Sequence, residues 1–356
     1  MKKLHILDMT LQEIEQQMLF AGFTKFRAEQ IYLSIYKKQK TTFSEIQGIS
    51  KEVKSYLSEN MSFSLPKIVK TLVSSQGDTI KWLLELATGD RIETVLMAYL
   101  DKDKSANRFT VCVSSQIGCA IGCPFCATGK MGFSRNLFAH EIVGQVLVAN
   151  TYISANFGSG AVGNIVFMGM GEPFLNYENL SQSIKILNEP KGLQIGMRKI
   201  TVSTSGVIPK IATFAQEFPQ ATLAISLHTP FDLQRNEMVP INRKYNLQEL
   251  MQAVAEFIKI TNSRVTFEYA LIAGVNDSIK HANALVKFLK GVLCHVNLIP
   301  LNGIKTGEMQ RSKALVIKEF SQVLLKAGIV TTLREEKGQD ISAACGQLIS
   351  EIEEGE

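Results

Sequence analysis

Residues 111–133 read VCVSSQIGCAIGCPFCATGKMGF, and they place Cys119, Cys123 and Cys126 in a C-x-x-x-C-x-x-C spacing. Three thiolates this close in the chain can hold one metal centre. A cubane iron–sulfur cluster normally takes four thiolates, so three protein ligands leave one iron open to a ligand from outside the protein. The stretch begins with a short apolar run typical of a strand, which places the cysteines on the loop that follows. The spacing therefore predicts a metal centre with an open coordination position.

A structural zinc site is the alternative interpretation of these cysteines. Zinc prefers four protein ligands, usually supplied as two pairs joined by a spacer. No second pair is found in this sequence, because Cys112, Cys294 and Cys345 each stand alone. The competing prediction is thus a zinc-stapled module without catalysis, which would be colourless and contain zinc.

The composition indicates a cytoplasmic globular protein. The chain has 356 residues, 46% of them hydrophobic, which is enough for a large core in one large or two ordinary domains. Lys and Arg outnumber Asp and Glu by 38 to 33, a mild excess that is compatible with a polyanionic partner. The clustered cysteines favour a reducing compartment over a disulfide framework. We expect neither a signal peptide nor a membrane span, since no apolar run has the required character.

The first part of the chain, residues 1–65, is predicted to be a small helical accessory domain. Thr10 and Glu13 match a capping box ahead of an apolar stripe, and a second helix is expected over residues 26–38. Residues 66–104 change to an alternating pattern, which predicts a β-rich extension. The basic end of the second helix either complements the helix dipole or forms a phosphate-binding edge. Its lysines are Lys37, Lys38 and Lys40.

From residue 105 to residue 340, apolar strand patterns alternate with helical patterns. Such alternation predicts parallel strands, because each helix returns the chain to the same end of the sheet. Six or seven units fall short of the eight in a closed barrel. The predicted fold class is therefore α/β, an incomplete (β/α)6-type barrel with a helical N-terminal accessory domain and a C-terminal segment over 341–356. Strands are expected near 109–113, 164–168, 199–202, 222–225, 265–271, 295–300 and 328–333.

One glycine motif is a false lead. Residues 158–163, GSGAVG, match the G-x-G-x-x-G dinucleotide fingerprint letter for letter. That fingerprint follows a strand and opens a helix. Here the motif follows a helical pattern and leads into an apolar run, so we interpret it as a loop.

Polar residues and glycines follow almost every predicted strand. In parallel α/β folds the carboxyl ends of the strands meet at one edge, where ligands bind. We therefore expect these residues to line one pocket around the three cysteines. Glu172, between Gly171 and Pro173, is suited to accept from an ammonium group, whereas His228 has a core histidine as its alternative. The residues after the strands include Glu172, Ser203, Ser226, His228, Asn302, Arg334 and Cys345.

Several segments together resemble the RlmN/Cfr family of radical S-adenosylmethionine (SAM) ribosomal RNA methyltransferases. The resemblance covers nearly the whole chain, including FRAEQIYLSIYKK at 26–38, which is similar to the family's helical N-terminal domain. The cysteine triplet alone indicates the superfamily, whereas GMGEP and AACGQL indicate the family. One departure is Gly303, where the family usually has proline. The segments are GCAIGCPFCATG (118–129), GMGEPFLN (169–176), STSG (203–206), AISLH (224–228), NLIPLN (297–302) and GQDISAACGQL (338–348).

The resemblance implies a role for each of these positions. Cys119, Cys123 and Cys126 become the ligands of one [4Fe-4S] cluster. Cys345 becomes the methyl-carrying cysteine, Cys112 the thiol that resolves the intermediate, and Glu93 the proton acceptor. The implied SAM contacts are Gly171, Glu172, Ser203, Ser226, Leu227, His228 and Asn302.

The resemblance also implies the reaction, which uses two SAM molecules per turnover. One methylates Cys345, and the other yields a 5′-deoxyadenosyl radical that takes a hydrogen atom from the S-methyl group before its carbon adds to adenine. Pro173 and Pro300 favour carbon 2 of adenine 2503 in 23S rRNA over carbon 8, the Cfr-like position that gives antibiotic resistance. Adenine 37 of tRNA stays open as a second substrate. An electron donor such as flavodoxin or ferredoxin and a monomeric state are also expected, and the zinc alternative becomes an RNA-binding module without catalysis.

Overall fold

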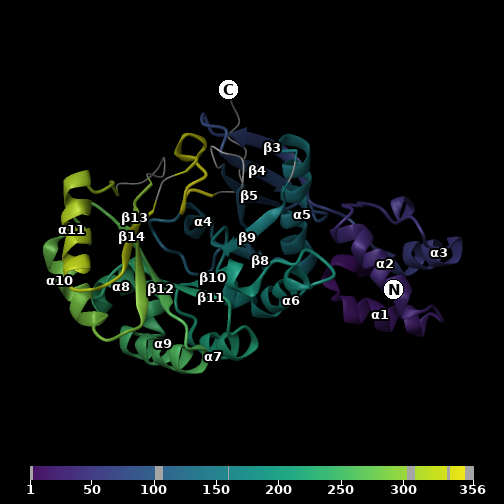
Figure 1. Cartoon of the computed structure of the whole chain (residues 1–356). Coiled ribbons are helices and arrows are strands. Elements are labelled where there is room, and N and C mark those ends of the chain that lie inside the picture. Colours follow the sequence, from purple (N-terminus) through teal and green to yellow (C-terminus); the bar gives the residue numbers. More distant parts are fainter. Residues whose placement is uncertain (1–2, 101–106, 159, 303–308, 335–336, 349–356) are drawn as a thin grey trace.

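The computed structural model describes residues 3–100, 107–158, 160–302, 309–334 and 337–348. Its N-terminal part is helical and lies beside α5 and α6 (Figure 1). The predicted capping box is confirmed, because Thr10 Oγ1 accepts from the backbone N of Glu13 while the Glu13 carboxylate accepts from the backbone N of Thr10. The elements of this part are β1 (Leu4–His5), α1 (Leu11–Phe20), α2 (Lys25–Tyr36), α3 (Lys51–Asn60) and β2 (Met61–Ser62).

The rest of the chain is built on a ten-stranded sheet with the order β14-β13-β12-β11-β10-β9-β6-β5-β4-β3. Within this sheet, β3 pairs antiparallel with β4 and β4 with β5, which makes two hairpins. Strand β5 in turn pairs antiparallel with β6. From β6 onward, neighbouring strands are parallel, which confirms the predicted βα alternation. The strands are β3 (Lys67–Val73), β4 (Thr79–Glu85), β5 (Arg91–Tyr99), β6 (Arg108–Cys112), β9 (Val162–Phe167), β10 (Ile200–Thr204), β11 (Thr222–Ser226), β12 (Val265–Leu271), β13 (Cys294–Pro300) and β14 (Thr331–Leu333).

Helices cover the outer face of the parallel strands (Figure 1). In α9, Leu250, Val254 and Phe257 are buried at helical spacing, so one apolar stripe packs against the sheet. Within the described residues the hydrogen-bonded strand order is open, ending at β14 and β3, as expected for an incomplete barrel. None of the described helices is long and apolar enough to cross a membrane. The helices are α5 (Ala139–Asn156), α6 (Tyr177–Asn188), α7 (Ile208–Glu217), α8 (Asp232–Met238), α9 (Leu247–Thr261), α10 (Ile279–Phe288) and α11 (Ala314–Lys326).

The glycine motif at 158–163 is a connection, as its context predicted. Gly158 follows the end of α5, and Gly163 already lies within β9. Residue 159 lies outside the described residues. One continuous apolar core contains residues from both the N-terminal helices and the barrel. The division of the chain at residues 65, 104 and 340 stays a prediction.

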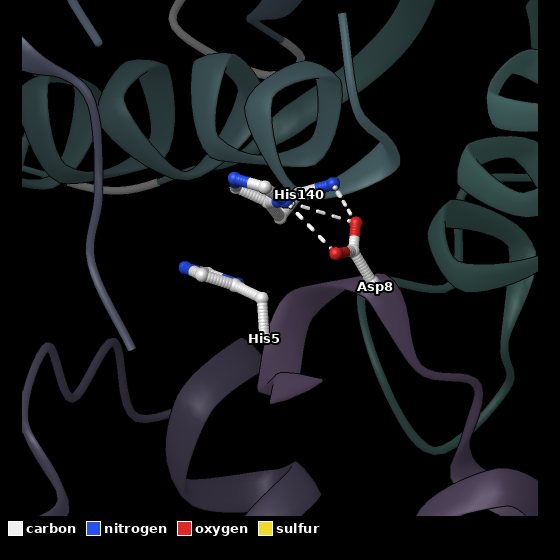
Figure 2. Close-up of side chains that lie close together, drawn as sticks. All are labelled: His5, Asp8 and His140. Atoms are coloured by element: carbon white, nitrogen blue, oxygen red, sulfur yellow. Dashed lines mark hydrogen bonds and ion pairs between the residues drawn. The ribbon is translucent and has the colours of Figure 1, made fainter. Parts of the chain in front are cut away.

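His5, Asp8 and His140 join the N-terminal part to the barrel (Figure 2). Asp8 Oδ1 accepts from the backbone N of His140, at 2.7 Å, and thereby caps the start of α5. The His5 and His140 rings stack with their centroids 3.9 Å apart and their planes 17° apart. Although one ligand atom from each of the three residues lies within 4.8 Å of the others, nearly parallel stacked rings direct their in-plane nitrogen lone pairs along separate planes. We therefore interpret this group as a docking contact and not as a metal site.

Candidate active site

The three clustered cysteines lie on a loop that glycines allow to fold tightly. The loop leaves β7 (Gln116–Gly118), passes through α4 (Ala127–Lys130) and returns as β8 (Phe133–Asn136). Gly118 has φ of 71°, and a Cβ at this position would lie 1.8 Å from the carbonyl oxygen of Gly132. The backbone N of Cys119 donates to that same oxygen at 2.8 Å. A side chain at residue 118 would therefore push the two arms of the loop apart.

The three thiols are not drawn together as they would be around zinc. In the described part of the chain, only His5, Asp8 and His140 bring three ligand atoms within 4.8 Å of one another, so at least one pair of the three sulfurs lies farther apart than this. Tetrahedral zinc with Zn–S bonds of about 2.3 Å would draw its sulfurs to about 3.8 Å. Burial raises the pKa of Cys119 to about 12, so a metal centre must displace the thiol proton when it binds. The loop thus supplies three thiol donors for a metal centre.

Residues from the ends of six strands line one cavity beside these thiols, with a volume of about 160 Å³. This arrangement follows from the parallel sheet, whose strand ends meet at one edge. The cavity lies over a small apolar cluster that includes Ile121 and Leu301 and packs against Cys119 and Cys123. The predicted residues in its lining are Cys119, Cys123, Cys126, Gly171, Glu172, Ser203, Ser226, His228, Asn302, Arg334 and Cys345.

Glu172 is held rigidly at the edge of this cavity. Its Oε2 accepts from the backbone N of Ser205 at 2.7 Å and its Oε1 from the backbone N of Phe174 at 3.1 Å. Burial raises the pKa of Glu172 despite these hydrogen bonds. At Gly171, φ is 102° and a Cβ would lie 2.6 Å from the Cβ of Gln116, so the turn before the carboxyl group requires glycine. The arrangement fixes an acceptor that suits a cationic ammonium group.

His228 is a neutral donor in the same wall. Its φ of 62° is unusual for a residue other than glycine. Its Nδ1 accepts from the backbone N of Ala270 at 3.0 Å, so Nε2 carries the proton in the neutral ring. Burial, together with the charge of Arg235, lowers the pKa of His228 to about 3. The preceding Leu227 is fully buried in the core and is not among the described residues that line the cavity, so its contact with SAM stays a prediction.

A second cavity, with a volume of about 210 Å³, is lined by Cys112 and Cys345, the two cysteines to which the resemblance assigns the thiol chemistry. Cys112 ends β6, and Cys345 lies in the C-terminal segment. Burial raises the pKa of Cys112 to about 12. Cys345 lines both cavities and therefore stands where the two meet. The residues common to both linings are Met168, Ile299, Asn302, Arg334 and Cys345.

Glu93 lies behind the wall of the second cavity. It is buried on β5, two residues before the cavity-lining Val95 and hence on the same face of the strand. Its carboxylate forms an ion pair with the buried Nζ of Lys81 at 2.8 Å. The same Nζ donates to the carbonyl oxygen of Ser342, three residues before Cys345. Glu93 is therefore linked to the segment that carries Cys345, although it is not among the described lining residues.

The stretch of residues 337–348, which includes the described part of the C-terminal segment, is held between the first hairpin and the cysteine loop. It presents Cys345 because both its ends are fixed by polar contacts. Asn302 is tied to the same segment, since Gln339 Nε2 donates to Asn302 Oδ1 at 2.8 Å. Gly303, the departure from the family pattern, lies outside the described residues. The fixing contacts are Lys337 with Asp78, Asp340 with Ser75, Gly346 with Ala127 and Leu348 with Thr128.

Arg235 is a buried residue of the site that sequence patterns do not reveal. Its guanidinium donates to the carbonyl oxygen of Ser205 at 2.7 Å and to that of Ser226 at 3.0 Å. It also donates to Asn242 Oδ1 at 2.8 Å. Arg235 therefore fixes two strand-end turns relative to each other. It sits in α8, which has only seven residues, so no periodicity separates it from solvent-exposed neighbours.

Two family models match this chain. The Radical SAM superfamily matches residues 113–286, and the Ribosomal RNA large subunit methyltransferase N-terminal domain matches residues 4–62. Together they cover the cysteine loop, most of the parallel strands and the N-terminal helices.

Relatives over the full length have one name in common. Proteins named "Probable dual-specificity RNA methyltransferase RlmN" from Clostridium novyi and Caldanaerobacter subterraneus are 46% and 47% identical over 344 residues, covering 97% of this chain and 97% of theirs. A crystal structure of a radical SAM methyltransferase from Sphaerobacter thermophilus superposes with a TM-score of 0.92 at 44% identity, covering 98% of this chain and 100% of that one. The chain therefore belongs to the RlmN family of radical SAM RNA methyltransferases.

Proposed function

We propose that this enzyme methylates carbon 2 of adenine 2503 in 23S rRNA and, as a second substrate, adenine 37 of some tRNAs. The observation that carries the proposal is the position of Cys345, which lines both cavities. A methyl group on its sulfur can be acquired on one side and delivered on the other. Support for two RNA classes comes from the relatives, which are named as dual-specificity enzymes. Carbon 2 is favoured by Pro173 and Pro300, which stand as in the carbon-2 branch of the family.

The cysteine loop and the first cavity are proposed to hold one [4Fe-4S] cluster and SAM. When bound, these groups supply the methyl group for Cys345 and the radical that activates that methyl group. The protein's part is to fix the donor beside the acceptor. Glu172 accepts from the ammonium group, and the turns that contain Ser203, Ser226 and Asn302 surround the rest of SAM. His228 contributes a neutral N–H donor, because its ring stays unprotonated at physiological pH.

The second cavity is proposed to receive the adenine and to complete the transfer. Once the methyl carbon has bonded to the ring, the adduct must lose the ring proton, and Glu93 is the proposed acceptor. The Cys112 thiolate then attacks the sulfur of Cys345, and the bond from this sulfur to the product carbon breaks. The electron pair of that bond passes to the product, whose CH2 carbon takes up a proton to become the methyl group, and the Cys112–Cys345 disulfide that remains must be reduced before the next turnover. Both thiols line this cavity, which supports the pairing. The buried position of Glu93 keeps bulk water from competing for the proton.

A reconstituted assay tests the proposed product. Anaerobically prepared enzyme, SAM and reduced flavodoxin or ferredoxin are incubated with a 23S rRNA fragment that contains adenine 2503, or with tRNA. Mass spectrometry of the digested nucleosides should show 2-methyladenosine from both RNAs. A product that carries its methyl group on carbon 8 would instead support the Cfr-like alternative.

The same assay tests the proposed use of two SAM molecules. Each methylated adenine should be accompanied by one S-adenosylhomocysteine and one 5′-deoxyadenosine, because one SAM charges Cys345 and the other is cleaved. One S-adenosylhomocysteine and no 5′-deoxyadenosine for each methylated adenine would contradict the radical route. Sedimentation of the same preparation tests the proposed monomeric state.

A further inference from the structure

Lys81 is a buried cation that contacts two parts of the proposed reaction centre. Its side chain is only 8% exposed, and its Nζ lies 2.8 Å from Glu93 Oε1. The same Nζ donates to the carbonyl oxygen of Ser342 at 3.1 Å. Burial of an ammonium group is costly unless the group is paired and hydrogen-bonded, and these two contacts offset that cost. One side chain thus joins the proposed proton acceptor to the stretch of residues 337–348, which carries Cys345.

The register of the sheet explains why Lys81 and Glu93 meet. Lys81 on β4 is the register partner of Val95 on β5. Glu93 precedes Val95 by two residues, so its side chain is the diagonal neighbour of Lys81 on the same face of the sheet. Val95 lines the second cavity, and the ion pair therefore lies on the face of the sheet that bounds this cavity. The strand ladder itself brings the two side chains together.

Contacts that do not involve Lys81 fix the backbone of Glu93. The Oγ of Ser114 donates to the carbonyl oxygen of Glu93 at 2.6 Å and accepts from the backbone N of Met170 at 3.0 Å. Ser114 is itself fully buried, and its backbone N donates to Gln145 Oε1 at 2.8 Å. Strand β5 should therefore keep its place when Lys81 is replaced. What Lys81 fixes is the direction of the Glu93 carboxylate.

The stretch of residues 337–348 is held at several points besides Lys81. Asp340 Oδ2 accepts from the backbone N of Ser75 at 2.7 Å, and Thr128 Oγ1 donates to the carbonyl oxygen of Leu348 at 2.6 Å. Because neither contact involves Lys81, its replacement should leave this stretch attached and Cys345 in place. The effect of Lys81 on Glu93 can therefore be separated from its effect on Cys345.

We propose that Lys81 is a positioning residue for the proton transfer from the RNA adduct to Glu93. This inference rests on the proposed roles of Glu93 and Cys345. In that step the ring C–H bond breaks, its proton passes to a carboxylate oxygen of Glu93, and its electron pair stays in the ring. Lys81 exchanges no proton. It holds the carboxylate on the cavity face and sets its place relative to the stretch that carries the adduct.

The test follows two steps separately in the anaerobic holoenzyme. Without RNA, mass spectrometry follows the methylation of Cys345 by SAM, starting from unmethylated protein, and Lys81→Met should be methylated as the wild type is. With labelled RNA, denaturing gels follow the covalent adduct. The adduct should last at least about tenfold longer in Lys81→Met, because a misplaced acceptor slows the proton transfer. Impaired methylation of Cys345 together with slow loss of the adduct would indicate a general structural role and overturn the proposal.

A double variant shows whether Lys81 acts through Glu93. Glu93→Gln should itself accumulate the adduct, and Lys81→Met/Glu93→Gln should hold it no longer than Glu93→Gln alone. A longer lifetime in the double variant would overturn the inference. Normal turnover by Glu93→Gln would overturn the proposed role of Glu93 as well, whereas a stalled Glu93→Gln beside an unaffected, folded Lys81→Met would overturn the role of Lys81 alone.

Asp340→Ala is the matched control, because it removes another contact of the same stretch without touching Glu93. It should leave no lasting adduct. A lasting adduct in this variant would assign the effect to a loosened stretch and would overturn the proposal. If Lys81→Met does not fold, Lys81→Gln replaces it. This variant keeps an N–H donor but has no charge, and it must also slow the loss of the adduct.

Discussion

Removal of either thiol of the second cavity should stop the reaction, but at a different step for each. Cys345→Ala lacks the methyl acceptor, so it should give neither methylated RNA nor a protein–RNA adduct. Cys112→Ala can still load and transfer the methyl carbon but cannot break the bond to Cys345, so RNA should stay covalently attached to the protein. Denaturing gels with labelled RNA distinguish the two results. Cys294→Ala, which alters a cysteine outside both described linings, should behave as the wild type.

Lys81 should be important for stability as well as for Glu93. Their ion pair is buried, and removal of one partner leaves a charge in a poorly solvated place. We expect Lys81→Met to lower the free energy of unfolding by about 3–5 kcal/mol, measured by urea denaturation. The double variant Lys81→Met/Glu93→Gln should recover part of this loss, because the uncompensated charge is gone. Equal losses in the single and double variants would show that the ion pair is not the cause.

Among the elements, the end of α2 offers the clearest test of RNA binding outside the cavities. Lys37 and Lys38 are exposed there, whereas Lys40 is half-buried. If the two exposed lysines contact phosphates, Lys37→Glu/Lys38→Glu should weaken RNA binding at low salt. It should also reduce the slope of log Kd against log salt by about 1.4–1.8, from roughly 0.7–0.9 per phosphate contact.

The matched control for this pair lies at the C-terminal end of α10, at the far side of the molecule from α2 (Figure 1). Lys287 and Lys290 are also exposed, so Lys287→Glu/Lys290→Glu changes the net charge equally. An equal effect of both variants would indicate general attraction by net charge. No effect of the α2 variant would leave its lysines as complements of the helix dipole.

The contribution of the contact between β1 and the start of α5 to the stability of the protein should depend on pH. Burial and the neighbouring His140 lower the pKa of His5 from 6.5 to about 4, so the folded protein binds fewer protons there than the unfolded chain. The contribution of neutral His5 to stability is therefore complete above about pH 6.5 and is lost as the pH falls toward 4. His5→Phe keeps a stacked ring without the titration. Its Tm should fall less than that of the wild type between pH 7.5 and pH 5, and parallel curves would argue against this origin.

For the molecule as a whole, the sequence allowed the barrel to be predicted because its signals are local. Apolar strands such as 265–271 and helices such as 247–260 can be recognised from periodicity, and the parallel order then follows from their alternation. The convergence of Glu172, His228 and Asn302 could be expected for the same reason, since each follows a strand. The cysteine spacing added the predicted position of a metal centre within that arrangement.

What the sequence did not reveal depends on contacts between distant parts of the chain. Lys81 lies in an apolar strand pattern, and its pairing with Glu93 arises only because β4 and β5 are neighbours in the sheet. Arg235 is buried in a short helix in which Leu233 is exposed, so the sequence pattern does not mark the buried face. The stacking of His5 on His140 joins residues that are 135 positions apart, and no local pattern encodes it.

Metal content tests the whole assembly. Anaerobically purified protein should contain about four iron and four sulfide per chain and absorb visible light, whereas the non-catalytic alternative requires colourless protein with zinc. Removal of the iron with a chelator should abolish SAM cleavage. It should leave the helical content near its starting value, because most of the core lies outside the cysteine loop.

The attachment of the C-terminal segment to the cysteine loop gives the protein an order of assembly. Gly346 and Leu348 bond to Ala127 and Thr128, directly after Cys126, so the proposed methyl acceptor is attached to the loop that is proposed to bind iron. An iron-free chain should hold this segment loosely, and limited proteolysis should cut it faster near Cys345 than in the iron-loaded enzyme. With the proposed roles, we expect methylation of Cys345 to wait until the metal centre is in place, so that SAM is not consumed by a chain that cannot complete the reaction.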